Sequence, residues 1–282
     1  MIFGGSSTQS LAAALSEALG DELALVDYER FPDGELKVNV GDVTPDRAVV
    51  VASTASSDAH VECLQLQDAA REAGATEVVT VLAYMGYARQ DEAFEAGDPV
   101  SARALARAIS TGSDRVLTVN PHETAVCEFF EPTATAVDGA GVLANPLPDD
   151  LREPLFLAPD EGACALAETV RDAYGCGDTD HFVKHRVSGD EVEITPSDAA
   201  VADRDVVVVD DIVATGSTMS ESIAVLRDRD AASVSVATVH PLFAANAVTK
   251  LRRAGVSRIV GTDTLERPQS VVSVAPAIAE HL

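Results

Sequence analysis

The chain has 282 residues, of which 46% are hydrophobic, and its 46 acidic and 20 basic residues give a formal net charge of −26. Such a charge repels polyanions and argues against nucleic acid as a partner. No apolar run approaches the roughly 18 residues of a membrane span, and residues 1–5 lack the basic-then-apolar pattern of a signal peptide, so we expect a cytoplasmic protein with no membrane partner.

Short apolar strands alternate with helical patterns along the chain. The predicted strands are 2–4, 23–27, 48–52, 77–83 and 115–119 in the first half, and 155–158, 181–185, 191–194, 206–210, 233–239 and 257–261 in the second. The predicted helices are 8–19, 60–73, 101–110, 162–174, 217–229, 246–254 and 275–281. This alternation is typical of an α/β fold in which helices flank mostly parallel, doubly wound sheets.

The length allows two domains, and a cluster of turn formers from Asn145 to Asp150 marks the boundary between predicted domains 1–145 and 146–282. A weak internal repeat agrees with this division, because the strand–helix–strand pattern around Ala75 can be aligned with the one around Ala231. Two related α/β domains in tandem explain the repeat; chance similarity between two βαβ units is the alternative.

The cysteines indicate neither a zinc site nor a disulfide framework. Cys63, Cys127, Cys164 and Cys176 show no Cys-x-x-Cys spacing. We therefore expect buried, reduced thiols.

Three groups of polar residues in the first half follow apolar segments. The stretch from Phe31 to Lys37 contains Pro-Asp-Gly, which alone is a turn signal. The Tyr84–Asp91 segment leaves the predicted strand 77–83, and its Arg89 offers a planar donor fork that suits phosphate oxygens or a surface ion pair. His122 follows the strand 115–119, at a position where a ligand pocket is expected. It either contacts a ligand there or has a purely structural role.

Residues 206–218 are the part of the sequence that says most about the function. Four valines end at two adjacent carboxylates, Asp210 and Asp211, where parallel sheets bind ligands. A loop of small and hydroxyl residues, Thr215-Gly216-Ser217-Thr218, then leads into a helix, which can turn several N–H groups toward one phosphate. The pattern favours a sugar phosphate; ordinary helix capping is the structural alternative.

This last stretch resembles the phosphoribosyl-diphosphate (PRPP) motif of the type I phosphoribosyltransferases and of the PRPP synthetases. Motifs of the PRPP synthetase family occur in order over nearly the whole chain: Phe31 to Glu35, Gly86 to Asp91, Arg115 to His122, Ala158 to Gly162, Lys184-His-Arg186, and Asp210 to Thr218. The resemblance implies two tandem type I phosphoribosyltransferase-like domains, each a mostly parallel sheet flanked by helices. It also implies transfer of diphosphate from ATP to ribose 5-phosphate.

The same resemblance implies a role for each matching residue. ATP would be bound by Phe31, Asp33, Glu35, Arg89, Gln90 and His122, with the first three acting across a subunit interface. Ribose 5-phosphate would be bound by Asp210, Asp211, Thr215, Gly216, Ser217 and Thr218. Mg²⁺ would be the cofactor, held by His122 and Asp160, and Lys184 and Arg186 would stabilise the transition state. The shared ATP site implies a homo-oligomer, at least a dimer.

Some positions depart from the family pattern. Ala214 stands where many relatives carry an acid, which removes one candidate base or metal ligand. Asn120 stands where many have Asp, and residues 92–98 are acidic where many are basic. A phosphoribosyltransferase and a catalytically silent subunit of the same fold are the rival interpretations. The residue 31–35 motif and Lys184-x-Arg186 oppose the first, and the intact set of site residues opposes the second.

The net charge of −26 predicts a halophilic protein. In molar salt the Debye length is about 3 Å, so most self-repulsion is screened there. Transfer from molar potassium chloride to dilute buffer should therefore lower the far-ultraviolet circular dichroism of the helices. An unchanged spectrum and unchanged activity would favour the alternative, an acidic mesophilic enzyme.

Lys184 is one of only three lysines, and the other basic residues are arginines. If a compact ammonium is needed there, Lys184→Ala should raise the barrier by about 3–4 kcal/mol, as loss of one preorganised donor does. Steady-state turnover is the measurement, and near-wild-type turnover would remove Lys184 from the mechanism.

Overall fold

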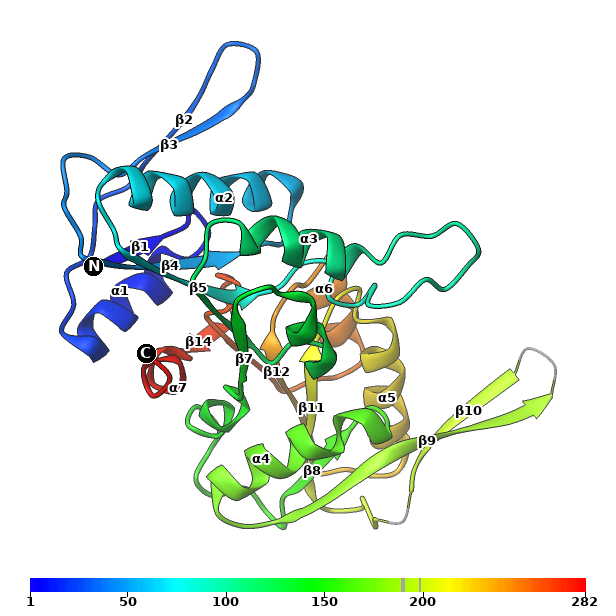
Figure 1. The fold of residues 1–282 in the computed structure, drawn as a ribbon. Helices are drawn as coiled ribbons and strands as arrows, with labels where there is room; N and C mark the ends of the chain where they lie inside the picture. The colour runs from blue at the N-terminus through cyan, green and yellow to red at the C-terminus, as the bar shows by residue number, and fades with distance from the viewer. Residues whose placement is uncertain (189–190, 198) are drawn as a thin grey trace. The chain divides into compact units, whose positions relative to one another are not determined.

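The computed structural model describes the chain except residues 189–190 and 198 and the side chains of residues 184–188 and 191–195. The described residues form two compact units (Figure 1). The first contains Met1–Gly139, Asp263–Glu266 and Ser273–Leu282, and the second contains Ala140–Thr262 and Arg267–Val272. No helix of the described residues is long and apolar enough to cross a membrane.

The sheet of the first unit has five parallel strands in the order β1-β4-β5-β6-β7. They are β1 (Ile2–Gly4), β4 (Arg47–Ser53), β5 (Glu77–Tyr84), β6 (Arg115–Val119) and β7 (Thr133–Val137). The helices are α1 (Gln9–Leu19), α2 (Ser57–Glu72), α3 (Ser101–Ser110) and α7 (Ala275–Ala279), with a 3-10 turn, η1, at Thr124–Phe129. Leu66 of α2 and Ile109 of α3 are almost fully buried against the sheet.

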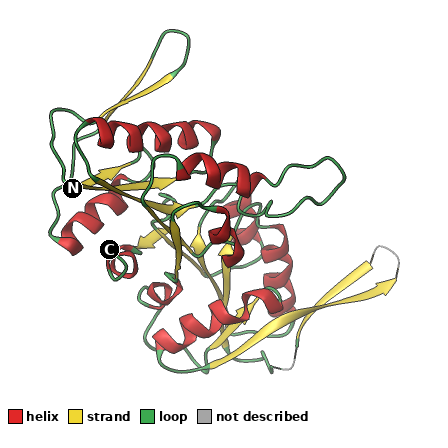
Figure 2. Ribbon diagram, viewed as in Figure 1, coloured by secondary structure: helices red, strands yellow, loops and turns green. Residues whose placement is uncertain are grey.

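The sheet of the second unit has seven strands in the order β10-β9-β8-β11-β12-β13-β14. They are β8 (Leu155–Ala158), β9 (Asp178–Ser188), β10 (Glu191–Pro196), β11 (Asp205–Ile212), β12 (Ser233–His240), β13 (Arg258–Thr262) and β14 (Ser270–Val272). The helices are α4 (Cys164–Tyr174), α5 (Ser217–Asp228) and α6 (Ala247–Arg253), with 3-10 turns η2 (Ala140–Ala144) and η3 (Glu161–Ala163). Among the described residues of this sheet, the β9–β10 pair is antiparallel and the other strand pairs are parallel (Figure 2).

The two sheets repeat one topology, because β8-β11-β12-β13-β14 follows the same spatial order as β1-β4-β5-β6-β7. In each unit one strand, β4 or β11, lies between a parallel strand that precedes it in the chain and one that follows it. Agreement over five strands supports a duplicated unit rather than a chance likeness between two βαβ segments. The predicted α/β fold with two mostly parallel sheets is confirmed.

The division of the chain differs from the predicted ranges 1–145 and 146–282. It falls between Gly139 and Ala140, because η2 packs on α4 and therefore belongs to the second unit. The end of the chain returns to the first unit, where Arg47 Nη2 donates to Leu282 O (3.1 Å) and Arg115 Nη2 donates to His281 O (3.0 Å). Sequence patterns left open on which domain the final helix packs, because the choice depends on contacts between residues far apart in the chain.

Some predicted elements need correction. The strand predicted at 23–27 reduces to one bridge between Leu23 and Ile2; the chain then leaves the sheet and forms a hairpin of β2 (Asp27–Arg30) and β3 (Leu36–Asn39). The strands β7 and β14, which are short and partly exposed, were not predicted. All four cysteines are free, but only Cys63 is buried, and Cys176 is exposed because it lies in the turn after α4.

Candidate functional site

Three acidic residues lie at the carboxyl end of the second sheet. Asp210 and Asp211 end β11, and Asp160 follows β8, which pairs with β11 in parallel register. Burial and the neighbouring charges of Asp211 and Asp160 raise the pKa of Asp210 well above its usual value. This edge therefore concentrates negative charge, which hydroxyl donors or a cation would relieve.

A row of backbone N–H groups lies directly after these carboxylates. In the described part of the chain the N–H groups of residues 214–219 have no acceptor, and the first internal bond of α5 runs from Ser220 N–H to Gly216 O (2.9 Å). No side chain caps this helix. Hydroxyls stand beside the row, with Thr215 Oγ1 and Ser217 Oγ 3.4 Å apart. Free N–H groups and hydroxyls at the positive end of a helix dipole suit an anion.

Local sequence explains this loop. The four valines 206–209 are at most 1% exposed, since β11 lies between β8 and β12 and both of its faces are covered. Gly216 has φ +69°, which favours glycine, and a Cβ there would lie 3.3 Å from Ala247 Cβ. The loop is thus held tightly against the start of α6.

A second group of predicted residues lies at the corresponding edge of the first unit. Arg89 and Gln90 follow β5, His122 follows β6, and these strands are neighbours. Arg89 and His122 are exposed, whereas Gln90 is anchored because its Oε1 accepts from Ser101 Oγ (2.6 Å) and its carbonyl accepts from Ala102 N–H (3.1 Å).

Thr54 fixes the segment that carries Arg89 and Gln90. Its N–H donates to Tyr84 O (2.9 Å), and its Oγ1 accepts from Gly86 N–H (2.9 Å). A Cβ at Gly86 would overlap the Thr54 carbonyl oxygen, so only glycine fits there. Sequence reasoning did not single out Thr54; its only signal was its place directly after a buried strand.

Phe31, Asp33 and Glu35 lie at the exposed tip of the β2–β3 hairpin of the first unit (Figure 1). Phe31 is 49% exposed. The tip is ordered by Phe31 N–H donating to Glu35 O (2.9 Å) and Glu35 N–H donating to Asp33 Oδ1 (3.2 Å). An exposed aromatic between two acids at a hairpin tip is suited to contact with another molecule.

Lys184 and Arg186 lie on β9, opposite Ile194 and Val192 of β10. Their side chains fall outside the described part of the structure, so the roles predicted for them remain predictions.

The predicted metal ligands lie in different units, His122 in the first and Asp160 in the second. Among the described residues no group of three or more His, Cys, Asp or Glu side chains is arranged to hold a metal ion. Asn120 has a structural role, because its Nδ2 donates to Asp138 Oδ1 (2.9 Å) and its Oδ1 accepts from Gly139 N–H (2.7 Å).

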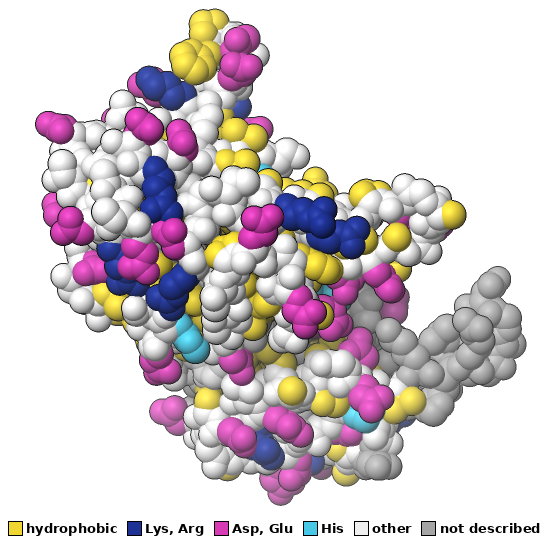
Figure 3. Space-filling model, in the orientation of Figure 1, with side chains coloured by type: hydrophobic (Ala, Val, Ile, Leu, Met, Phe, Trp, Pro, Cys, Tyr) yellow, Lys and Arg dark blue, Asp and Glu magenta, His cyan; other side chains and the backbone are white. Residues whose placement is uncertain are grey.

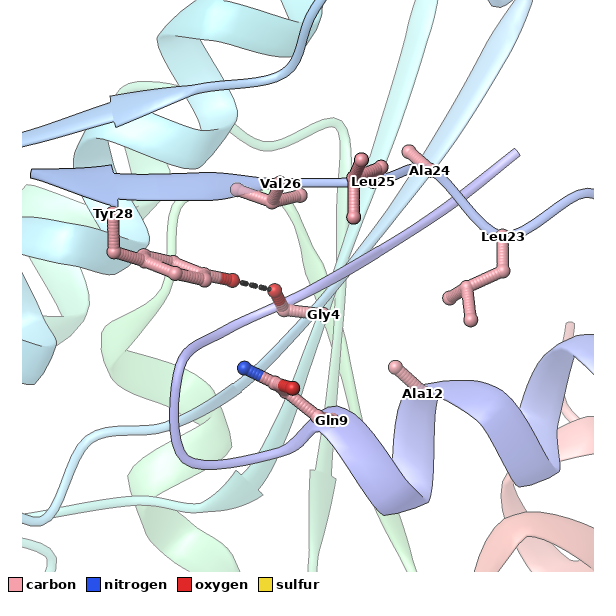
Figure 4. A pocket seen from close by; sticks show the side chains of 8 residues that line it. All are labelled: Gly4, Gln9, Ala12, Leu23, Ala24, Leu25, Val26 and Tyr28. Carbon is pink, nitrogen blue, oxygen red and sulfur yellow. Dashed lines mark hydrogen bonds between the residues drawn. The ribbon is translucent and has the colours of Figure 1, made fainter.

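A cavity of about 140 Å³ in the first unit has a different character (Figure 4). Its lining residues are Gly4, Gln9, Ala12, Leu23, Ala24, Leu25, Val26 and Tyr28. None of them is charged, and Tyr28 Oη donates to Gly4 O. This small space without charged side chains is unsuited to a phosphate.

Comparisons with known proteins agree on one family. A model of the N-terminal domain of ribose phosphate pyrophosphokinase matches residues 1–112, and a phosphoribosyl transferase domain model matches residues 140–274. Ribose-phosphate pyrophosphokinase of Halobacterium salinarum is 62% identical, and that of Methanosarcina mazei 45%; the matches cover 100% of this chain and 100% and 94% of theirs. In fold, the chain is similar to phosphoribosylpyrophosphate synthetase from Mycobacterium smegmatis, with a TM-score of 0.84, 24% identity, and coverage of 100% of this chain and 96% of that one.

The crowding of Asp210 predicts the effect of removing its charge. Its raised pKa means that the folded state disfavours the carboxylate, so this group stabilises the fold at low pH and loses that contribution as the pH rises through the folded pKa. Asp210→Asn should therefore raise the free energy of unfolding of the ligand-free protein at pH 7–8, measured by denaturant unfolding in molar salt.

Asp205→Asn on the same strand is the matched control. The Asp205 carboxylate accepts from Arg152 N–H (2.7 Å) and from Ser233 Oγ (2.5 Å), so its neutralisation should lower stability by about 1–3 kcal/mol. Equal destabilisation by both variants would contradict the interpretation of Asp210 as a crowded charge.

Proposed function

We propose roles for the individual residues of this chain, which belongs to the ribose-phosphate pyrophosphokinase family. The chain transfers diphosphate from ATP to the C1 hydroxyl of ribose 5-phosphate, which gives PRPP and AMP. The proposed roles rest mainly on one observation, the row of N–H groups without acceptors at residues 214–219 beside Asp210 and Asp211.

Ribose 5-phosphate binds at this edge of the second unit. Its phosphate accepts from the N–H groups and hydroxyls of Thr215, Gly216, Ser217 and Thr218, and its ring hydroxyls donate to Asp210 and Asp211. A sugar phosphate suits the edge because its hydroxyls relieve the crowded carboxylates while its anion meets the free donors. Ala214 has no polar side chain and contributes only its backbone. Its carbonyl accepts from Ala244 N–H (2.9 Å).

ATP binds through Arg89, Gln90 and His122 at the edge formed by β5 and β6. The guanidinium of Arg89 is exposed and has no ion-pair partner among the described residues, which leaves its donor fork available for phosphate oxygens. Phe31, Asp33 and Glu35 hold the adenine and ribose of a nucleotide bound to another subunit, because they project on an exposed hairpin. The active form is then a homo-oligomer, at least a dimer.

The chemistry of these side chains fits Mg²⁺. Magnesium takes oxygen ligands, usually one or two carboxylates together with substrate phosphates. Asp160 is one proposed ligand, since its charge contributes to the raised pKa of Asp210, and His122 is the other. When bound, the ion neutralises charge that builds on the transferred group.

The protein's own part in the reaction is positioning and cationic stabilisation. The C1 hydroxyl must approach the β-phosphorus in line with the departing AMP oxygen, and charge develops on the phosphoryl oxygens. Lys184 and Arg186, two residues apart on β9, are the proposed cations for this charge.

The activity is tested with purified protein in molar potassium chloride with ATP, magnesium and ribose 5-phosphate. AMP should form only when the sugar phosphate is present. Asp211→Asn should raise the KM for ribose 5-phosphate about 10- to 100-fold, as expected for loss of a charged hydrogen-bond acceptor, and should change the KM for ATP far less.

Other outcomes identify the rivals. Release of pyrophosphate from PRPP on addition of a base, without AMP formation from ATP, would indicate a phosphoribosyltransferase. A folded protein that does neither would indicate a silent subunit. An equal rise in both KM values for Asp211→Asn would contradict the assignment of that residue to ribose 5-phosphate.

A further inference from the structure

Lys250 lies beside the loop proposed to bind phosphate, although it belongs to none of the motifs that identify the family. Its Nζ donates to Ser217 Oγ over 2.8 Å, at the first residue of α5. It is half-buried and forms no ion pair with a carboxylate among the described residues. An ammonium carries three donors, and the two that remain have no acceptor in the described structure.

The backbone brings Lys250 to this position in a defined register. The segment between β12 and α6 pairs with the loop, since Phe243 N–H donates to Val213 O and Ala244 N–H to Ala214 O, each over 2.9 Å. Phe243 and Ala245 adopt positive φ angles of 43° and 53°, so the segment holds two residues in a costly conformation. Lys250 then follows Ala247, the residue that contacts Gly216, by about one helical turn.

Electrostatics of the ligand-free protein do not favour this position. A cation near the N-terminus of α5 faces the positive end of the helix dipole, where an anion is preferred. The last turn of α6 favours a basic residue, but Arg252 and Arg253 occupy the same turn and do not contact the loop. The direction of the Lys250 side chain, toward Ser217, is therefore what needs an explanation.

The charge of a bound ligand supplies that explanation. The loop from Asp210 to Thr218 contains two acids and no basic residue, so its own side chains provide no counter-charge for a phosphate. The ammonium already contacts the hydroxyl of Ser217, which is one of the proposed phosphate ligands. A phosphate that accepts from the 214–219 N–H row would lie next to it.

We propose that Lys250 is a ligand of the 5-phosphate of ribose 5-phosphate and supplies the positive charge that the loop lacks. The proposal rests on the ribose 5-phosphate site proposed above. In molar salt, charges act only over about 3 Å, so a lysine in direct contact is effective where distant arginines are screened. Ser217 holds the ammonium in place before the ligand arrives.

Lys250→Ala tests the proposal by steady-state kinetics in molar potassium chloride. The KM for ribose 5-phosphate should rise tenfold or more, while kcat and the KM for ATP stay within about twofold, because the phosphate is remote from the reacting C1 and is bound equally in ground and transition states. Lys250→Arg should restore most of the affinity, since it keeps the charge. Arg253→Ala is the control, because Arg253 is exposed in the same helix and its removal changes the net charge equally.

Thermal unfolding separates ligand binding from a structural role. Without ligand, Lys250→Ala should melt within a few degrees of wild type, whereas the concentration of ribose 5-phosphate needed for a given rise in Tm should increase about tenfold. Inorganic phosphate should show the same dependence on Lys250 if the loop accepts a free anion, and ribose without phosphate should show none.

The outcomes are separable. If wild type forms no AMP and is not stabilised by ribose 5-phosphate, the proposed site itself fails. Suppose instead that wild type forms AMP and is stabilised by ribose 5-phosphate. If Lys250→Ala then has the same KM for ribose 5-phosphate as wild type, or if Arg253→Ala loses as much affinity for it as Lys250→Ala, the lysine is not a ligand. If the ligand-free Tm of Lys250→Ala falls sharply and Lys250→Arg does not restore the affinity for ribose 5-phosphate, Lys250 has a structural role only.

Discussion

The second unit depends on placing negative charge and free hydrogen-bond donors side by side at the end of one strand. Burial and the neighbouring charges of Asp211 and Asp160 raise the pKa of Asp210, and in the described part of the chain the backbone N–H groups of residues 214–219 have no acceptor. Each of these two features is unfavourable alone, because crowded carboxylates repel one another and donors without acceptors lose hydrogen bonds. A ligand with hydroxyls at one end and a phosphate at the other satisfies both.

Duplication explains why only one unit has this edge. In the first unit the equivalent turn after β4 has a side-chain cap, since Ser56 Oγ accepts from Ala59 N–H (3.2 Å), and Thr54 bonds to Tyr84 and Gly86. In the second unit, Gly216 occupies the N-cap position and has no side chain that could cap the helix. The same strand–turn–helix is thus capped by a side chain and tied to a neighbouring segment in one unit, and it follows an acid pair and lacks a side-chain cap in the other. Local capping chemistry, rather than topology, distinguishes the two.

Sequence patterns predicted the strands and helices of the sheets well, because buried parallel strands read as runs of β-branched residues such as the four valines 206–209. The hairpin at 27–39 was missed because its strands are exposed and its residues polar, so no periodicity marks them. The acid pair and phosphate loop were predicted because they are contiguous in sequence. Lys250 and Thr54 were not, since their importance comes from hydrogen bonds to distant segments that no local pattern encodes.

The acidic surface constrains how such a protein can bind two anionic substrates. Acidic side chains are scattered over the face shown in Figure 3 rather than gathered in one patch, and the net charge of −26 repels anions at long range. Several arginines stabilise the fold instead. Arg204 donates hydrogen bonds to Glu153 O (2.7 Å) and to the carboxylate of Asp178 (2.6 Å), and Arg71 donates one to the carboxylate of Asp114 (2.5 Å). Neutral donors do not depend on ionic strength as ion pairs do, and a row of backbone N–H groups carries no net charge for salt to screen. The proposed phosphate site, which relies on backbone donors and a single lysine in contact, is therefore of a kind that physical chemistry favours in a chain of net charge −26.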